Sequence, residues 1–305
     1  MAFAAFATGQ ADPQDAPVRR RSTIALVLLL PGIAYMLLFF LAPLISLVLT
    51  SFQAEVPDGD IGEYAPGFAW QNYLVVMGDY WPHVLRSFGY ALIATVLALV
   101  ISYPLAYFIG VKARPWPLLQ NLLLTLVIAP FFISFLLRTL AWKQILADES
   151  PLVQALKAVA VLPSDGHLTG TPIAVIFGIT YNFIPFMTLP LYTTLERLDV
   201  RLLEAGSDLY AHPASVFWSV TVPLSMPGIV SGTLLTFIPA AGDYINASRD
   251  FLGSSQTSMV GNAIEANFLT LENYPAAAAL SIVLMAVILV IVGFYVKRSG
   301  TEDLL

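Results

Sequence analysis

The sequence predicts an all-α integral membrane protein with six transmembrane helices. Apolar residues make up 58% of the 305 residues and charged residues only 11%, which is less than half of the charged share of an ordinary soluble domain. Most of the uncharged runs are about as long as a helix that spans a bilayer, which requires about 20 residues. The runs are continuous and do not alternate between apolar and polar positions, which excludes a transmembrane β-barrel.

The uncharged runs place the six predicted helices in chain order. They are expected over residues 24–52, between 86 and 112, from 114 through 138 to 142, over 172–195, from 223 or 227 to 244, and over 276–296. The loops near 53–83, 143–171 and 245–275 would then share one side of the membrane. The first run is too long for the core of a signal peptide, so we expect it to be retained. Gly228 and Gly232 have a G-x-x-x-G spacing, which predicts close approach of a neighbouring helix.

The distribution of charge predicts that both termini are cytoplasmic. With both ends on one side, nine of the 14 basic residues fall on that side, and 12 of the 20 acidic residues fall on the other. Cytoplasmic loops of membrane proteins carry an excess of Lys and Arg. The chain therefore divides into a cytoplasmic tail over 1–21, a six-helix membrane domain over 22–296 and a second cytoplasmic tail over 297–305.

The composition also excludes several classes of site. The chain has no cysteine and three scattered histidines, His83, His167 and His212, so we expect no metal site. A net charge of −6 argues against a nucleic-acid partner. No Gly-Lys pair occurs anywhere, so the chain lacks the phosphate-binding loop that ATP hydrolysis would require.

Asp243 is the acidic residue placed within a predicted span, at the outer end of the fifth helix and next to Tyr244. A charge at that depth is costly unless it is paired or hydrated. We therefore weigh two interpretations, an anionic group on the route of a cation and a carboxylate at an interfacial helix end. Arg138, about one turn before Trp142, is expected to extend its side chain to the outer interface.

Four further residues are candidates for the path of a cationic substrate, and the first of them, Tyr244, follows Asp243 directly. Tyr181 and Phe186 flank Asn182 in the fourth span, and their rings could provide cation–π contacts to a polyamine. The alternative is ordinary packing of aromatic side chains. Glu265 follows in the last outer loop, where it could face the path or only the solvent.

The most specific feature is the long inner loop, residues 196–226. Apolar residues recur in it at helical spacing, at Leu198, Leu202, Ala205 and Leu209. Pro213 suits the first turn of a second short helix, which Pro223 and Pro227 would end. A helix–turn–helix with an exposed apolar stripe needs a partner surface to cover it. Four acidic residues against two basic ones disfavour an anionic bilayer, so we expect a protein partner.

The same loop carries a family resemblance. The segment LEAGSDLYAHP at 203–213, followed by VPLSMPGI at 222–229, resembles the EAA loop of permease subunits of binding-protein-dependent ABC importers. It departs from that pattern at Gly206, where alanine is usual, at Tyr210, where glycine is usual, and at His212, where serine is typical. Tyr210 is the most consequential departure, because glycine can adopt a left-handed turn that tyrosine adopts only at a cost.

Three segments within the spans extend the resemblance. Residues 130–142, 181–192 and 237–244 are similar to the corresponding parts of spermidine/putrescine permeases of the PotB type. Together with the loop, they cover most of residues 24–296. The resemblance implies the permease fold of a type I ABC importer, with residues 196–226 as its cytoplasmic coupling loop.

The resemblance also implies partners. These are a second homologous permease, two ATPase subunits that bind ATP and magnesium, an external solute-binding protein and the inner-membrane bilayer of a bacterium. This chain itself would hold no cofactor. The first helix of the loop would dock in a groove of the ATPase, so that closure of the ATPase pair moves the spans. The residues expected at that contact are Glu204, Ala205, Gly206, Asp208, Leu209, Tyr210 and Pro213.

The expected substrate is a polyamine, because the resembling permeases carry spermidine and putrescine. Related permeases carry iron, thiamine and other small solutes, so the same importer class with another solute is the alternative. A channel would need no ATPase-docking loop. An intramembrane enzyme would need a catalytic constellation in its spans, yet no histidine lies in a predicted span.

Overall fold

A computed structural model describes residues 23–57, 59–208 and 210–298 of the chain. The chain forms two compact units, Met1–Ser46 and Leu47–Leu305, and we describe each by itself. The predicted tail over 1–21 lies outside the described residues, as do residues 299–305 of the second tail. The helix α1 (Thr23–Met36) passes through the π-helical turn η2 (Leu37–Leu41) into α2 (Ala42–Ser51), which continues across the boundary into the second unit. This confirms the first predicted helix.

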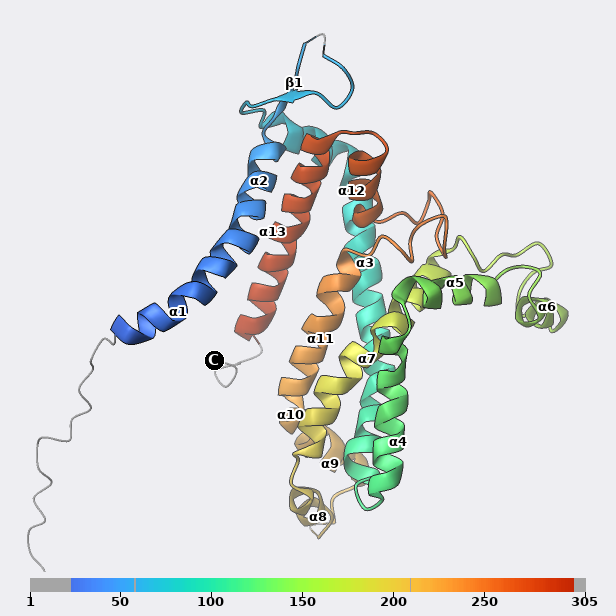
Figure 1. Cartoon of the computed structure of the whole chain (residues 1–305). Helices are drawn as coiled ribbons and strands as arrows, with labels where there is room; N and C mark the ends of the chain where they lie inside the picture. The colour runs from blue at the N-terminus through green and yellow to red at the C-terminus, as the bar shows by residue number, and fades with distance from the viewer. Residues whose placement is uncertain (1–22, 58, 209, 299–305) are drawn as a thin grey trace, which may run out of the picture. The chain divides into compact units, whose positions relative to one another are not determined.

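Three long helices form the core of the second unit. They are α3 (Gln71–Tyr107), α7 (Pro172–Glu196) and α11 (Met226–Ala241), which pack against one another (Figure 1). A Cβ on Gly232 would lie 2.8 Å from the Met187 sulfur, and one on Gly228 would lie 2.8 Å from the Pro190 carbonyl oxygen. The G-x-x-x-G pattern therefore places α11 directly against α7, as predicted.

A second cluster lies at the end of the bundle opposite the long inner loop. It contains α12 (Val260–Leu269), the first half of α13 (Tyr274–Arg298) and the start of α3. A short antiparallel pair, β1 (Ala54–Glu55) and β2 (Tyr64–Ala65), precedes α3, with Ala54 opposite Ala65. α3 begins at Gln71 and not near residue 84, because Val76 and Val84 are buried in this cluster. The outer loop expected over 53–83 is correspondingly shorter.

The third predicted span is sharply bent. The chain forms α4 (Pro117–Ile128), a 3₁₀ turn η4 (Ala129–Phe132) and α5 (Phe135–Ile145), and the two segments meet at 96°. Pro130 has no N–H to continue the helix, and Ile133 and Ser134 adopt extended backbone angles. A further short helix, α6 (Pro151–Ala158), lies in the following outer loop.

The inner loop forms four short segments between α7 and α11. They are α8 (Val200–Asp208), α9 (Pro213–Val216), the π-helical turn η5 (Phe217–Thr221) and α10 (Val222–Leu224). The last three form one helical stretch, which meets α11 at 66°. Pro213 begins this stretch, as predicted, but Ser225 breaks it. Pro223 lies within α10 and Pro227 within the first turn of α11, so the expectation that these two prolines end the second helix is wrong.

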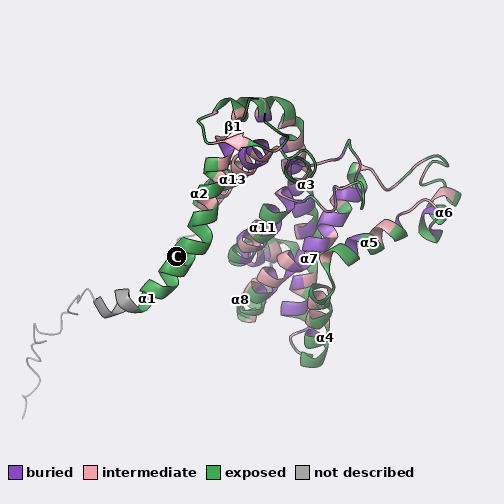
Figure 2. Ribbon diagram, turned by 45° about the horizontal axis from the view of Figure 1, so that its top comes forward, coloured by how far each residue is buried: buried purple, intermediate pink, exposed green. Residues whose placement is uncertain are grey.

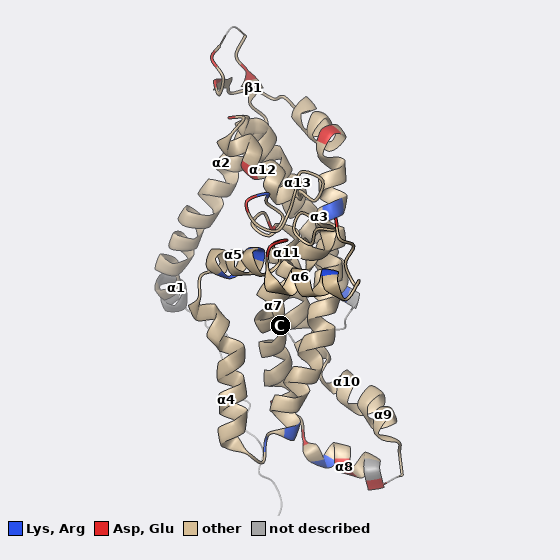
Figure 3. Ribbon diagram, turned by 90° about the vertical axis from the view of Figure 1, so that its right-hand side faces the viewer, with Lys and Arg blue, Asp and Glu red and all other residues tan. Residues whose placement is uncertain are grey.

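The distribution of burial and charge agrees with a membrane location. Buried residues gather on the facing sides of α3, α7 and α11 (Figure 2), and charged residues gather at the loops and helix ends (Figure 3). Four helices in the described residues are long and apolar enough to span a bilayer, or six if each bent pair counts as one span. α7 and α13 match the predictions over 172–195 and 276–296, and α13 continues into the predicted C-terminal tail.

Candidate functional site

The turn between α8 and α9 is built around a left-handed tyrosine. Tyr210 has φ +56°, and the Ala211 N–H donates to the Gly206 carbonyl at 3.2 Å. The His212 ring nitrogen Nδ1 accepts from the Ala214 N–H at 3.3 Å and so caps α9. The structure therefore keeps the turn that glycine usually provides, and Tyr210 adopts its unfavourable backbone angle.

Gly206 sets the distance between the two short helices. A Cβ at this position would lie 2.9 Å from Cγ2 of Val216, which is buried. A methyl group at 206 would therefore require the Val216 side chain or the helix that carries it to shift, which is consistent with glycine at this position. Glycine at 206 and valine at 216 form a matched pair.

The outward face of the loop presents most of the predicted docking residues to solvent. Glu204, Ala205, Asp208 and Pro213 are exposed, and the Tyr210 side chain is 98% exposed. Leu209 lies outside the described residues. The predicted apolar stripe is shorter than expected, because Leu198 precedes α8 and is buried. Trp218, at 68% exposure, adds an aromatic surface on η5 that the helical spacing did not reveal.

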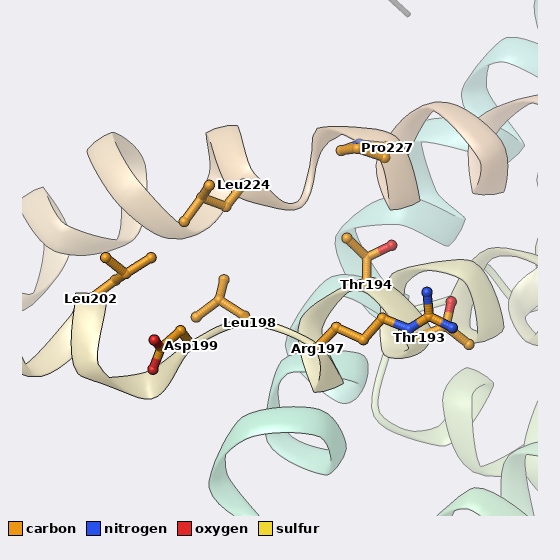
Figure 4. A pocket seen from close by; sticks show the side chains of 8 residues that line it. All are labelled: Thr193, Thr194, Arg197, Leu198, Asp199, Leu202, Leu224 and Pro227. Carbon is orange, nitrogen blue, oxygen red and sulfur yellow. The ribbon is translucent and has the colours of Figure 1, made fainter. Parts of the chain in front are cut away.

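A groove of about 560 Å³ runs along the base of the loop. Figure 4 shows its walls, which come from the end of α7, the start of α8 and the junction of α10 with α11. Its lining is mixed, with Leu202 and Leu224 beside the exposed charges of Arg197 and Asp199.

Directly after α11, Asp243 belongs to a buried polar network. Its carboxylate accepts from the Asn246 N–H at 2.8 Å and from Asn246 Nδ2 at 2.9 Å. Asn246 Oδ1 in turn accepts from Thr139 Oγ1 and Asn182 Nδ2, both at 3.3 Å. All four side chains are buried, and they join α5, α7 and the turn that follows α11. The role of Asp243 in a substrate path stays a prediction.

The structure moves the end of the fifth predicted helix and adds Thr139 and Asn246 to the predicted residues around Asp243. α11 ends at Ala241, so Asp243 and Tyr244 follow the helix and do not lie within it. Thr139 and Asn246 carried no local signal in the sequence. Gly178 makes room for them, since a Cβ there would lie 2.6 Å from Asn246 Oδ1.

Arg138 does not extend to the interface, and that expectation is wrong. Its side chain is only 8% exposed and its guanidinium carbon lies 5.6 Å from the centre of the Phe135 ring. Its Nε and one terminal nitrogen have no hydrogen-bond partner among the described residues. Arg138 is carried by α5, which packs against α7, and its side chain is buried there instead of extending outward.

The candidate aromatic residues are packed among other rings. Tyr181 lies edge-on to Trp142 at 5.2 Å between ring centres, and Phe186 lies edge-on to Phe131 at 4.9 Å. Tyr181 and Phe186 are half-buried, so part of each ring is accessible. Their contact with a cationic substrate stays a prediction.

Glu265 lines a separate outer cavity of about 640 Å³, between the start of α3, α12 and the loop that follows α11. Burial and the charge of Asp250 raise the pKa of the Glu265 carboxyl. The lining includes none of the other predicted path residues, although Asn262, which also lines it, donates to the Tyr244 carbonyl at 2.6 Å. The five path candidates therefore do not form one cluster in this chain alone.

Comparison with known proteins shows the protein family to which the chain belongs. The family model described as "Binding-protein-dependent transport system inner membrane component" matches residues 102–298, and the chain belongs to this family. It is thus a multi-pass inner-membrane permease subunit of an ABC transporter and not a catalytic enzyme. Among solved structures, it resembles a bacterial ABC transporter involved in the import of the acidic polysaccharide alginate, with a TM-score of 0.65 and 17% identity over 92% of this chain and 96% of that one.

Particular relatives are more informative than the fold. The spermidine/putrescine transport system permease protein PotB of Escherichia coli (strain K12) is 34% identical over 271 residues, which cover 88% of this chain and 94% of the relative. The protein of the same name from Salmonella typhimurium (strain SL1344) is 34% identical over 277 residues, which cover 90% and 93%. The segments that suggested this resemblance in the sequence lie within these matches.

Proposed function

We propose that this chain is the translocation subunit of an ATP-driven importer of polyamines. The observation that carries the proposal is its 34% identity to PotB permeases over about nine-tenths of both chains. The importer fold alone would not select a solute, since a chain of the same fold belongs to an alginate importer.

The complete importer would contain this subunit, a second homologous permease, two ATPase subunits and an external solute-binding protein. The excess of basic residues on one side supports cytoplasmic termini. ATP and magnesium would be held by the ATPase subunits, because the sequence has no phosphate-binding loop.

The exposed loop provides the mechanical contact in this proposal. α8 and the α9–α10 stretch present Glu204, Asp208 and Tyr210 away from the bundle, and a partner that closes on ATP would push or pull this surface. Since the loop joins α7 directly to α11, its movement would be carried into both core helices.

Two measurements test the proposal. The chain purified with its operon partners should retain a soluble ATPase, which neither a channel nor an intramembrane enzyme requires. The partner solute-binding protein should bind spermidine or putrescine and not iron or thiamine, as measured by calorimetry with each solute. Binding of another solute alone would remove the polyamine assignment, and absence of an ATPase would contradict the importer.

A further inference from the structure

The last turn of α7, from which the inner loop emerges, is held by one arginine. Arg114 lies in the short turn between η3 (Phe108–Lys112) and α4. Its guanidinium donates to the carbonyls of Leu195 and Leu198, each at 3.2 Å, and to that of Glu196. Its Nε donates to the Gly110 carbonyl of its own turn at 3.2 Å.

These contacts add side-chain donors at the end of α7, where the Leu195 carbonyl also accepts from the Arg197 and Leu198 N–H groups. The last four carbonyls of an α-helix have no partner within the helix, and that end carries a partial negative charge. Arginine is suited to this place because its planar fork offers five donors in fixed directions, whereas lysine offers a point charge. Arg114 therefore caps the end of α7 from outside.

Two independent contacts hold the same turn of α7. Gly110 is buried against it, since a Cβ there would lie 3.2 Å from the Glu196 nitrogen. On the other side, Gln120 of α4 donates to the Tyr192 hydroxyl at 3.3 Å, and that hydroxyl donates to Glu196 Oε1 at 2.7 Å. The α3–α4 turn and the start of α4 thus contact the end of α7 through the Gly110 backbone, the Arg114 guanidinium and the Gln120 amide.

The segment bonded to Arg114, residues 195–198, leads directly into α8. Leu198, whose carbonyl accepts from Arg114, is followed by Asp199 and then by the first residue of α8, Val200. On the α7 side of the loop, a force on α8 therefore passes through a segment that is bonded to the α3–α4 turn.

We infer that Arg114 is a positioning residue that makes α8, the end of α7 and the α3–α4 turn move as one body. This inference rests on the proposed docking of the loop to an ATPase. Without the guanidinium, the segment 197–199 can flex. α8 then moves with the ATPase, but its movement is not transmitted to the spans. ATP hydrolysis then continues with little transport.

The first test compares R114Q and R114K with K112Q in the complete reconstituted complex. K112Q is the matched control, because Lys112 is an exposed cation two residues away. R114Q and R114K should bind the ATPase normally and keep ATP turnover near wild type, yet transport about tenfold less substrate per ATP, as loss of a charge-assisted hydrogen bond predicts. K112Q should keep the wild-type ratio.

A second test does not require the substrate to be known. Spin labels at positions 118 and 201, both exposed, report the distance between α4 and α8. In the wild-type complex this distance should stay the same in the ATP-bound and ADP-bound states, and in R114Q it should differ between them. Equal behaviour of R114Q and wild type, or loss of ATPase binding in R114Q, would overturn the inference. Absence of polyamine transport by the wild type would remove the proposed substrate and leave this distance test intact.

Discussion

At the scale of single residues, Tyr210 gives the clearest test of the docking turn. Its φ of +56° and 98% exposure mean that tyrosine is strained here by roughly 1 kcal/mol without packing to offset it. Y210G should therefore be tolerated, with an unchanged or higher melting temperature, although the greater freedom of glycine in the unfolded chain offsets part of the gain. A substrate-stimulated ATPase rate well below wild type at normal expression would show that the ring fills a pocket of the partner.

Asp243 is the residue whose role most needs an experiment. D243N should leave assembly intact and lower polyamine uptake by about tenfold, because it removes the charge and one of the two hydrogen bonds to Asn246. Uptake into proteoliposomes that contain the complete complex would measure this.

The double variant D243N/N246D separates the two possible causes. It reverses the donor and acceptor of the pair and so restores a complementary network. If the charge at 243 acts on the substrate, uptake stays low. Recovery in the double variant would contradict that role and leave Asp243 as the group that holds Asn246.

At the scale of elements, α8 should lose its partner when its exposed face changes charge. E204K should lower recovery of the ATPase in pull-down by roughly tenfold, because complementary charges at an interface fix its specificity. E149K is the matched control, since Glu149 is equally exposed in the outer loop after α5. Equal recovery of both variants, with unchanged transport-coupled hydrolysis, would contradict docking through Glu204.

The outer segment around α6 is held by Asp148, which contacts His167 and lies 3.5 Å from Lys157. The hydrogen bond to His167 and the charge of Lys157 lower the pKa of the Asp148 carboxyl. A lowered pKa means that the contact is fully present at neutral pH and is lost as the pH falls through that value. D148N should raise amide exchange over residues 147–168 at neutral pH, and acid should remove the difference from wild type.

Local signals explain which elements the sequence predicts well. α7 was predicted to within a residue because Thr171 caps it, Pro172 begins it and Glu196 is the first charge after the apolar run. Pro130 indicates a kink between α4 and α5, but the apolar run continues through it, so the sequence does not predict the 96° bend. The start of α3 was missed because Asp79, His83 and Arg86 read as loop residues, while their helix is buried on another face.

The candidate sites also differ in whether their residues are close together in the sequence. The short helices within 196–226 could be predicted because prolines and helical spacing are local features of the sequence. The network around Asp243 was missed because Asn246 joins Thr139 and Asn182, which lie 107 and 64 residues away in the chain. The residues that Arg114 contacts at the end of α7 are likewise more than 80 positions away in the chain.

At the scale of the whole second unit, α7 connects the loop at 196–226 with the buried network around Asp243. Its 25 residues correspond to about 37 Å of helix. Asn182 in its middle belongs to this network, and Tyr192 and Glu196 at its end take part in the contacts with the start of α4. A movement of the docking loop can thus reach this network through one packed element.

The measurement that tests the central claim most directly is ATP-driven uptake of radiolabelled spermidine and putrescine into proteoliposomes that hold this chain, its permease partner and both ATPase subunits, with the solute-binding protein outside. Accumulation of polyamine that requires both ATP and the binding protein, and that excess unlabelled polyamine suppresses, is the predicted result. Accumulation of another solute with no uptake of either polyamine under the same conditions would contradict it.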